Sequence, residues 1–467
     1  MSISFDHSRY LSPFSWRYGS EEMRAIWSEI HKRQLWRRIW IEIARAQQPA
    51  GLVTAAQVTD LQAHAGQIDI GRAEAIEAEI QHDLMAEVKV FAEQCPVGGS
   101  IIHLGATSAD IEDNADALRL RDSLRLLLPK LERVLECFAG LMVTYANQPA
   151  IAFTHLQPAE PTTTGYRFAL YAQDLLEDYQ SLKSITESIR GKGFKGAVGS
   201  RASYTDLFEG TSVTPQQFED QVMNALELPP YPITGQTYPR KQDYTVLAAL
   251  GGLAGSLYKF AFDLRLLQSP VIGEWQEGFG AKQIGSSAMP FKRNPINAEK
   301  MDSLARFVAS LTQTAWGNAA HSLLERTLDD SANRREILPS ALLACDELLI
   351  ICERILKRLS VNASAVARNL ARYGLFSATE RVMMAAVKNG ADRQEIHEVL
   401  RQLSMQAWEA VTNGHENPLA ALVAEDAALD KYLTPAARMS LMEASSHVGD
   451  TPERTRAFAA HIRKTIG

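Results

Sequence analysis

The hydrophobic residues of this chain recur mostly at intervals of three and four positions, the spacing of one face of an α-helix. In segment 115–145, leucine, phenylalanine and methionine residues form such a stripe, and charged residues fall mostly between them. Four further segments show the same spacing: 164–189, 243–268, 299–324 and 332–359. The strict alternation typical of strands is scarce. The pattern therefore predicts an all-α fold.

These five segments predict unusually long helices. At a rise of 1.5 Å per residue, roughly 25 to 30 residues make a helix about 40 Å long, well above the usual mean of about 11 to 12 residues. Long helices with wide apolar faces pack together as a bundle. Some of these faces are apolar enough to suggest that copies of the chain associate, bundle against bundle.

Glycine, proline, serine and threonine concentrate between the predicted helices, where the chain must turn. The richest segments are 96–114, 147–163, 191–215, 228–242 and 269–298. These breaks predict three domains along the 467 residues. We expect an N-terminal helical domain (1–111), a central bundle of five long helices (112–360) and a C-terminal helical domain (361–467).

Composition narrows the class of protein. The formal charge is −7 and hydrophobic residues make up 46%, which is close to a globular average. A mildly acidic chain lacks the basic surface of a general nucleic-acid or membrane binder. The 4 cysteines include no C-x-x-C pair, which is typical of reduced thiols. Neither a signal peptide nor an apolar run of about 18 residues is visible, so we expect a cytoplasmic protein with no membrane span.

One loop inside the predicted bundle, 278–298, is a candidate for chemistry. Its segment GSSAMPFKRNP (285–295) combines the hydroxyls of Ser286 and Ser287 with the cations of Lys292 and Arg293 and the amide of Asn294. Such a set suits the binding of a carboxylate. Long loops in compact helical proteins are usually functional or disordered, and on composition alone an exposed connector fits equally well.

The same segment resembles the signature of the fumarase/aspartase superfamily, whose lyases split a succinyl group from nitrogen or oxygen and release fumarate. Further segments resemble the adenylosuccinate lyase family in particular, and they follow the order of that family. They are RYLSP (9–13), HDLM (82–85), HLGATSAD (103–110), THLQP (154–158), TGQTYPRK (234–241) and ERTLDDSANRR (325–335). Beyond residue 335 the resemblance is loose, a helical tail.

The resemblance implies a fold and an assembly. It implies an all-α, fumarase/aspartase-like fold with a central bundle of five long helices flanked by two smaller helical domains. It also implies a homotetramer with a twenty-helix core, in which each active site takes residues from three subunits. The implied partner is a small nucleotide substrate, with no nucleic acid, membrane, metal or cofactor.

The implied reaction belongs to purine nucleotide biosynthesis. Fumarate is eliminated from adenylosuccinate, giving AMP, and from succinylaminoimidazole carboxamide ribotide, giving aminoimidazole carboxamide ribotide. By resemblance, Ser286 is the general base, His155 the general acid and Glu299 the carboxylate partner of that histidine. Judged without the resemblance, a single histidine is more often structural. A neutral serine is also a poor base unless backbone N–H groups stabilise its alkoxide.

The resemblance also assigns substrate contacts. Lys292, which counts among the catalytic residues as well, is expected to hold the succinyl carboxylates together with Asn294, Thr107 and Ser108. His82 would lie against the nucleotide and assist catalysis. The remaining expected contacts are Asp83 for the nucleotide, Gln236 near the base or a carboxylate, and Arg9, Tyr10, Arg326, Ser331 and Arg335 for the 5′-phosphate. Gln81 stands where the family often has a basic residue, and Lys300 stands where it commonly has an arginine. Lys300 is kept as an expected substrate contact.

Two other motifs carry less weight, and two other functions remain open. The segment 191–196 fits G-x-G-x-x-G, but no strand precedes it, so we interpret it as a glycine-rich turn. His397 and Glu398 lack a second histidine at the zinc spacing. The alternative functions are another fumarate-releasing lyase, such as argininosuccinate lyase or fumarase, and a non-catalytic helical scaffold. The cluster from Arg326 to Arg335 argues against the first, and the complete set of catalytic residue types argues against the second.

Overall fold

The computed structural model describes residues 8–280 and 282–467. These residues form mainly α-helices, with three short 3-10 helices and four short strands, so the predicted all-α class is confirmed. The α-helices are α1 (Glu21–Ile26), α2 (Glu29–Gln47), α3 (Ala55–His64), α4 (Ile70–Ile80), α5 (Asp83–Gln94), α6 (Ser108–Thr144), α7 (Thr164–Ser188), α8 (Ala202–Phe208), α9 (Pro215–Ala225), α10 (Lys241–Gln268), α11 (Ile296–Ala320), α12 (Ser331–Leu356), α13 (Ala363–Lys388), α14 (Arg393–Thr412), α15 (Leu419–Glu425), α16 (Pro435–Leu441) and α17 (Thr451–Ile466). The 3-10 helices and strands are η1 (Pro13–Ser15), η2 (Gly99–Ile101), η3 (Ala444–Ser446), β1 (Pro149–Thr154), β2 (Gln157–Thr163), β3 (Trp275–Gln276) and β4 (Ser360–Val361).

The five long helices predicted from the hydrophobic pattern are α6, α7, α10, α11 and α12. Their bounds agree with the prediction to within a few residues, except that α6 begins earlier, at Ser108. The segment 108–114 is rich in aspartate and asparagine, which hides the apolar period. Serine and acidic residues nevertheless favour the first turn of a helix, because they complement its free N–H groups and its dipole.

The chain divides into two compact units. Unit 1 comprises Met1–Leu131, Asp178–Gly255 and Ser303–Ile350, and unit 2 comprises Glu132–Glu177, Ser256–Asp302 and Ile351–Gly467. Each of the five long helices contributes residues to both units. The three sequence-based domains are a different division of the chain and stay a prediction.

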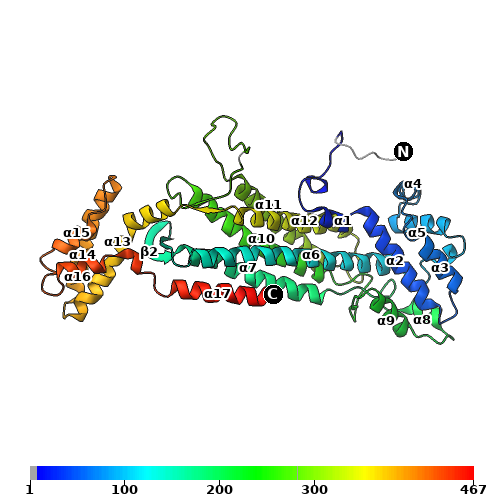
Figure 1. Cartoon of the computed structure of the whole chain (residues 1–467). Coiled ribbons are helices and arrows are strands. Elements are labelled where there is room, and N and C mark those ends of the chain that lie inside the picture. Colours follow the sequence, from blue (N-terminus) through cyan, green and yellow to red (C-terminus); the bar gives the residue numbers. More distant parts are fainter. Residues whose placement is uncertain (1–7, 281) are drawn as a thin grey trace. The chain divides into compact units, whose positions relative to one another are not determined.

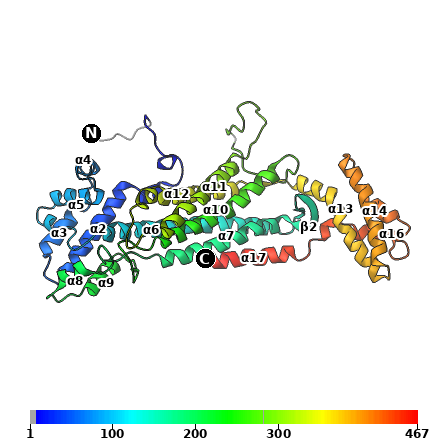
Figure 2. The same cartoon turned by 180° about the vertical axis from the view of Figure 1, so that it is seen from behind.

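In unit 1, helix α2 packs against α3 and α9, and buried charges fix it to α5 (Figure 2). The fully buried Glu87 of α5 accepts from Arg33 at 2.8 Å and from Arg37 at 2.7 Å. A buried carboxylate needs partners of this kind, because leaving it unpaired is strongly destabilising. The two arginines therefore hold α5 in place, and its first turn carries His82 and Asp83.

The long helices of unit 1 are joined by polar as well as apolar contacts. Lys130 of α6 forms an ion pair with the buried Asp346 of α12. Asp346 also accepts the backbone N–H of Ser20 at 2.6 Å, which anchors the start of α1. The buried thiol of Cys345 lies 3.7 Å from the carbonyl oxygen of Leu250 in α10.

Unit 2 has an aromatic core where α6, α7 and α10 meet strand β3. The rings of Phe168 and Trp275 stack with centroids 4.1 Å apart, and Phe138 meets Phe260 edge-on at 5.1 Å. Beside them, Arg167 of α7 donates to the buried Glu274 at 2.6 Å. Aromatic rings in these geometries stabilise the core beyond their buried area.

The C-terminal helices of unit 2 have a core of their own (Figure 1, orange). Buried apolar side chains from α13, α14 and α15 pack together there, and Leu433 and Met442, on either side of α16, join them. Helix α13 also contacts strands β1 and β2. It thereby connects this helical cluster to the hairpin that carries His155.

That hairpin was not expected as a strand pair. Strands β1 and β2 pair antiparallel from Pro149↔Thr163 to Thr154↔Gln157, with an irregularity between Ile151 and Phe153. The segment contains several prolines and lacks clean alternation, because Pro158 and Pro161 occupy strand positions. The sequence therefore shows a turn-rich stretch there, whereas the structure shows two edge strands, where proline is tolerated.

Helix α10 is long and apolar enough to meet a composition test for a membrane span. In its most apolar window, 44% of the residues are buried inside the protein. The core helix of a soluble protein passes the same test.

Candidate active site

Ser286 lies in the loop before α11 with its hydroxyl among backbone N–H groups. Its Oγ accepts from the N–H of Met289 at 3.1 Å and from that of Ala288 at 3.3 Å. Ser287, by contrast, is exposed. Backbone N–H groups that converge on one oxygen stabilise negative charge there, so the loop has the feature that a serine base requires.

Close backbone packing shapes this loop. A Cβ atom on Gly285 would lie 2.2 Å from the carbonyl oxygen of Lys292, so only glycine fits without a shift. The amide of Asn294 donates to the carbonyl of Gly285 at 3.0 Å. Asn294 thus closes the loop, while the side chain of Lys292 is exposed.

The base of the loop is fixed to the start of α11. The carboxylate of Glu277 accepts the backbone N–H groups of Asn297 and Ala298 at 3.2 and 3.1 Å, and burial raises the pKa of Glu277. Further along α11, Glu299 lies 4.0 Å from Arg265, whose main partner is Asp302 at 2.6 Å. The expected pairing of Glu299 with His155 stays a prediction. Lys300 is half-buried on the same helix.

His155 occupies the tip of the β1–β2 hairpin. It and Leu156 form the two-residue connection, with φ of 54° and 59°. A turn with two positive φ values matches the twist of a hairpin, but it favours Asn-Gly rather than two larger side chains. Strain of this kind tends to occur at functional sites. The turn presents His155 as an exposed side chain.

A second group of expected site residues gathers in unit 1, around the start of α5. The imidazole Nε2 of His82 lies 3.4 Å from the hydroxyl of Ser108 at the start of α6. Next to it, Asp83 pairs with Arg335 of α12 at 2.9 Å. Four of the predicted substrate contacts therefore come together from three helices.

A buried carboxylate fixes the turn that carries Thr107 and Ser108. Asp110 accepts the N–H of Thr107 at 3.1 Å and the hydroxyl of Tyr204 at 3.2 Å. The ammonium of Lys192, itself fully buried, forms an ion pair with the same carboxylate. Lys192 belongs to the glycine-rich segment 191–196, which thus helps to position the turn.

Gln236 is brought beside the segment that precedes α12. Its backbone N–H donates to the carbonyl of Glu325 at 3.0 Å. A Cβ on the preceding residue, Gly235, would lie 2.6 Å from that same carbonyl oxygen. This close approach of two backbones places Gln236 next to Arg326 in the fold.

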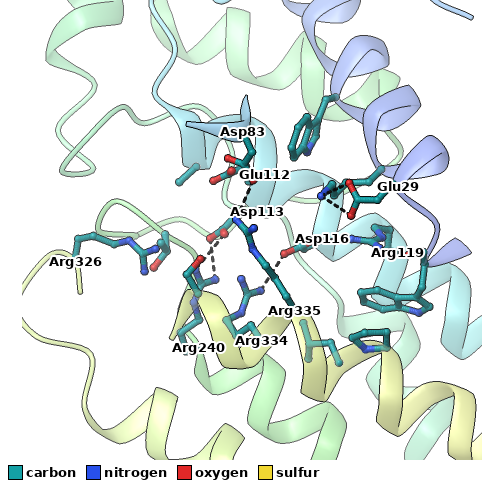
Figure 3. Close-up of a pocket in the computed structure, with 18 residues that line it drawn as sticks. Glu29, Asp83, Glu112, Asp113, Asp116, Arg119, Arg240, Arg326, Arg334 and Arg335 are labelled. Atoms are coloured by element: carbon teal, nitrogen blue, oxygen red, sulfur yellow. Dashed lines mark hydrogen bonds and ion pairs between the residues drawn. The ribbon is translucent and has the colours of Figure 1, made fainter. Parts of the chain in front are cut away.

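Arg326, Ser331 and Arg335 line one pocket with a volume of about 160 Å³, called the arginine pocket below (Figure 3). The residues between Arg326 and Ser331 are not helical, so the chain can bend there. Such a bend is needed to bring Arg326 and Arg335 to the same site. Asp83 lines the same pocket. Five arginines line this pocket, and guanidinium groups bind phosphate well. Five carboxylates line it too, and three of them pair with Arg240, Arg334 and Arg335.

Several charged residues of this pocket were not singled out from the sequence. Buried Arg240 donates to Asp330 at 2.5 Å and to Asp113 at 3.0 Å, and Asp330 also holds Arg326 at 2.8 Å. Buried Arg334 pairs with Asp243 at 2.7 Å. Their signal lay in the motifs TGQTYPRK and ERTLDDSANRR, which contain these arginines and Asp330.

Glu112 is another pocket residue that the sequence did not reveal. It lines the pocket (Figure 3). In the sequence it follows Ser108, the first residue of α6, by one helical turn. Burial, together with the neighbouring carboxylates of Asp83, Asp113 and Asp116, raises the pKa of Glu112 to about 7. The pocket therefore contains a carboxyl group that changes charge near neutral pH.

The predicted site residues belong to both units of the chain. Unit 1 holds those near His82 and the arginine pocket, and unit 2 holds His155 and the Ser286 loop. Arg9 and Tyr10 lie at the start of the described chain with exposed side chains.

One group of possible metal ligands is present among residues 8–280 and 282–467. Atoms of Asp60, His64 and Cys95 lie within 4.8 Å of one another. Asp60 accepts the N–H groups of Val97 and Gly98 at 2.8 and 2.7 Å, and His64 Nδ1 lies 2.9 Å from the carbonyl of Asp60. These contacts explain the cluster as a link between α3 and the chain after α5.

The fold and these motifs define a class, the all-α lyases of the fumarase/aspartase type. Residues 23–309 match the lyase family, and residues 376–458 match the adenylosuccinate lyase C-terminus. The chain is similar to 3-carboxy-cis,cis-muconate lactonizing enzyme from Pseudomonas putida (TM-score 0.85, 24% identity, 97% of this chain and 99% of that one). It is also similar to fumarate lyase from Mesorhizobium sp. BNC1 (TM-score 0.83, 22% identity, 97% and 99%).

Sequence relatives identify the family more narrowly. The chain is 40% identical to adenylosuccinate lyase of Saccharomyces cerevisiae over 461 residues, 97% of this chain and 94% of that one. It is 34% identical to adenylosuccinate lyase of Archaeoglobus fulgidus over 455 residues, 97% and 99% of the two chains. The chain belongs to the adenylosuccinate lyase family and is a lyase. The C-terminal helices, whose sequence resembles the family only loosely by motif, lie within the matched residues.

Proposed function

We propose that this enzyme eliminates fumarate from adenylosuccinate, giving AMP, and from succinylaminoimidazole carboxamide ribotide, giving aminoimidazole carboxamide ribotide. The observation that carries the proposal is the hydroxyl of Ser286, which accepts two backbone N–H groups. The same donors that contact the neutral oxygen would stabilise an alkoxide. The Ser286 alkoxide removes a proton from the succinyl carbon β to the C–N bond.

The electron pair left on carbon spreads into the adjacent carboxylate and forms an aci-carboxylate. Cations and amide donors stabilise this developing dianion. Lys292 and Asn294 take this role, and Thr107 and Ser108 bind a carboxylate through their hydroxyls. The dianion then collapses, the C–N bond breaks, and fumarate leaves.

The departing nitrogen receives a proton from His155, because an imidazole transfers protons well near neutral pH. Glu299 orients that imidazole. His82 and Asp83 bind the nucleotide, with Gln236 close to the reacting carboxylate. Arg326, Ser331 and Arg335 bind the 5′-phosphate together with Arg9 and Tyr10, and Lys300 is a further substrate contact.

We further propose that the active form is a homotetramer. The expected site residues fall in two separate units of the chain, and the family resemblance assigns each site to three subunits. Apolar side chains left exposed on the long helices, such as Leu170, Leu266 and Trp316, support association of copies. We retain a cytoplasmic location as part of the proposal.

The experiment is to measure fumarate release from the purified protein with adenylosuccinate, argininosuccinate and malate in parallel. We expect release from adenylosuccinate alone, since the arginine pocket has no phosphate to bind in the other two substrates. Release from argininosuccinate or malate instead would assign a different reaction of the superfamily. A folded protein that binds AMP but releases no fumarate from any of them would support the scaffold.

A further inference from the structure

The glycine-rich segment 191–196 has no part in the chemistry proposed above, yet it is built into the core of unit 1. A Cβ on Gly193, whose φ is +76°, would lie 2.0 Å from Glu219 Oε1, so glycine is required there. This close packing places two lysines, Lys192 and Lys195, inside the protein. Lys192 forms an ion pair with Asp110, whereas Lys195 lies beside Glu219.

Lys195 lines a cavity of about 490 Å³ that is separate from the arginine pocket. The charged groups lining this cavity are the cations of Arg190, Lys195 and Arg201 and a single carboxylate, Glu219. The hydroxyls of Ser200 and Tyr231 line it as well. Three cations against one carboxylate leave the lining with two excess positive charges.

The single carboxylate is shared between two of the cations. Glu219 Oε1 accepts from Lys195 at 2.5 Å, and Glu219 Oε2 forms an ion pair with Arg201. Arg190 donates to the carbonyl of Pro230 at 3.4 Å, and no carboxylate among residues 8–280 and 282–467 pairs with it. Burial and the charges of Arg201 and Lys192 lower the pKa of Lys195 to about 8.

We propose that this cavity binds a phosphate group, as inorganic phosphate or a small phosphomonoester. A dianion balances the two excess charges, and guanidinium, ammonium and hydroxyl donors all bind phosphate oxygens. A rigid dicarboxylate such as fumarate fits less well, because its carboxylates point in opposite directions and only one reaches the cations. The site is additional to the substrate site and does not depend on the proposed reaction.

The test is titration calorimetry of the full-length protein with inorganic phosphate. The background is Arg335→Ala, which removes an arginine of the other pocket. We expect this background still to bind phosphate, and the further double change Arg190→Gln with Arg201→Gln to weaken binding by about tenfold or more. Lys195 still pairs with Glu219 in that variant, so the buried carboxylate keeps one partner. Arg368→Gln is the matched control, since Arg368 is exposed and also donates to a backbone carbonyl, that of Ile272.

Unchanged phosphate affinity in the double variant would overturn the site, as would complete loss of binding in Arg335→Ala alone. Parallel titrations with inorganic phosphate and glycerol 3-phosphate distinguish free phosphate from a phosphomonoester. The ligand with the higher affinity is assigned as the occupant. Neither result depends on fumarate release, so failure of this proposal and failure of the proposed function are distinguishable.

A second measurement isolates Lys195. Sulfate keeps its double charge from about pH 6.5 to about pH 9, whereas an amine of pKa about 8 loses its proton in that interval. The charged groups that face Lys195 are Arg201, Lys192, Asp110 and Glu219. We expect sulfate to bind more weakly at the higher pH. Equal affinity at both pH values would overturn the role of Lys195 in the site.

Discussion

The hydroxyl of Ser286 differs from that of its neighbour in one respect that matters for acid–base chemistry. Two backbone N–H groups point at the oxygen of Ser286, whereas Ser287 is exposed. The choice between the two serines was implied by family resemblance only. The geometry now supplies a physical reason to favour Ser286, and it makes that choice testable.

We expect Ser286→Ala to lower turnover of adenylosuccinate by about 100-fold or more, because the proton acceptor is gone. Substrate affinity, measured by calorimetry, should change little, since the base acts on a C–H bond. Ser287→Ala is the matched control and should keep turnover within a few-fold of the starting protein. Near-normal turnover in Ser286→Ala would contradict the assignment.

The raised pKa of Glu112 predicts that the stability of the folded protein depends on pH. Its pKa in the folded protein is about 7 against 4.5 for the free side chain, so the folded state holds this proton more tightly than the unfolded state does. The carboxylate therefore destabilises the fold increasingly between about pH 4.5 and 7, and fully above that range. We expect Glu112→Gln to raise the melting temperature at about pH 8 and to have no such effect near pH 4.5.

Thermal unfolding followed at several pH values checks this expectation. The exposed Glu187 of α7 provides the control Glu187→Gln, which should show no pH-dependent difference. A stability gain that is the same at both pH values would show that packing, rather than charge, explains the effect of Glu112→Gln.

At the residue level, sequence reasoning found side chains that lie in distinctive motifs and missed those whose role depends on folding. Arg326 and Arg335 stand out by their spacing. Asp330 and Glu112, in contrast, look like ordinary acidic residues. Only the fold shows that Asp330 joins two arginines and that Glu112 is surrounded by carboxylates.

Among the elements, the loop before α11 is held in shape by one glycine. We expect Gly285→Ala to lower turnover by about tenfold or more, because the added methyl would displace the backbone of Lys292 and with it the donors around Ser286. The melting temperature should change little, since the loop lies outside the buried core. Steady-state kinetics and thermal unfolding measure the two effects.

Gly317→Ala in α11 is the control, because nothing lies within 4 Å of an added Cβ there. Alanine in a helix is favoured over glycine by about 0.5 to 1 kcal/mol, so this variant should be slightly more stable with normal turnover. Normal turnover in Gly285→Ala would show that the loop does not depend on this close packing.

Long helices were predictable because their apolar stripes repeat over many turns, and the local signal accumulates with length. The β1–β2 hairpin was not, because its strands lack clean alternation and their contacts with α13 are distant in the sequence. The start of α6 was also missed, since polar capping residues there lack the apolar period.

For the whole molecule, the exposed apolar faces predict how copies associate. Leu170 of α7 is 50% exposed, and a charge at a buried subunit contact is strongly unfavourable. We expect Leu170→Glu to shift the protein from the proposed tetramer toward smaller species in analytical ultracentrifugation. Met405→Glu in α14, where the replaced side chain is 57% exposed, should leave the assembly unchanged.

Identical sedimentation of Leu170→Glu and the starting protein would show that Leu170 does not lie in a subunit interface. Loss of fumarate release together with dissociation would support the sharing of sites between subunits. Full activity in a dissociated monomer would contradict that sharing.

The left-handed turn at His155 and Leu156 implies a trade-off between stability and catalysis. Asn-Gly would suit this connection better, so selection for a more heat-resistant chain would favour the replacement of both residues. That replacement would also remove the proposed proton donor. Directed evolution for heat resistance alone should therefore yield more stable proteins that have lost turnover through replacement of His155. Selection for turnover at the same time should prevent that replacement.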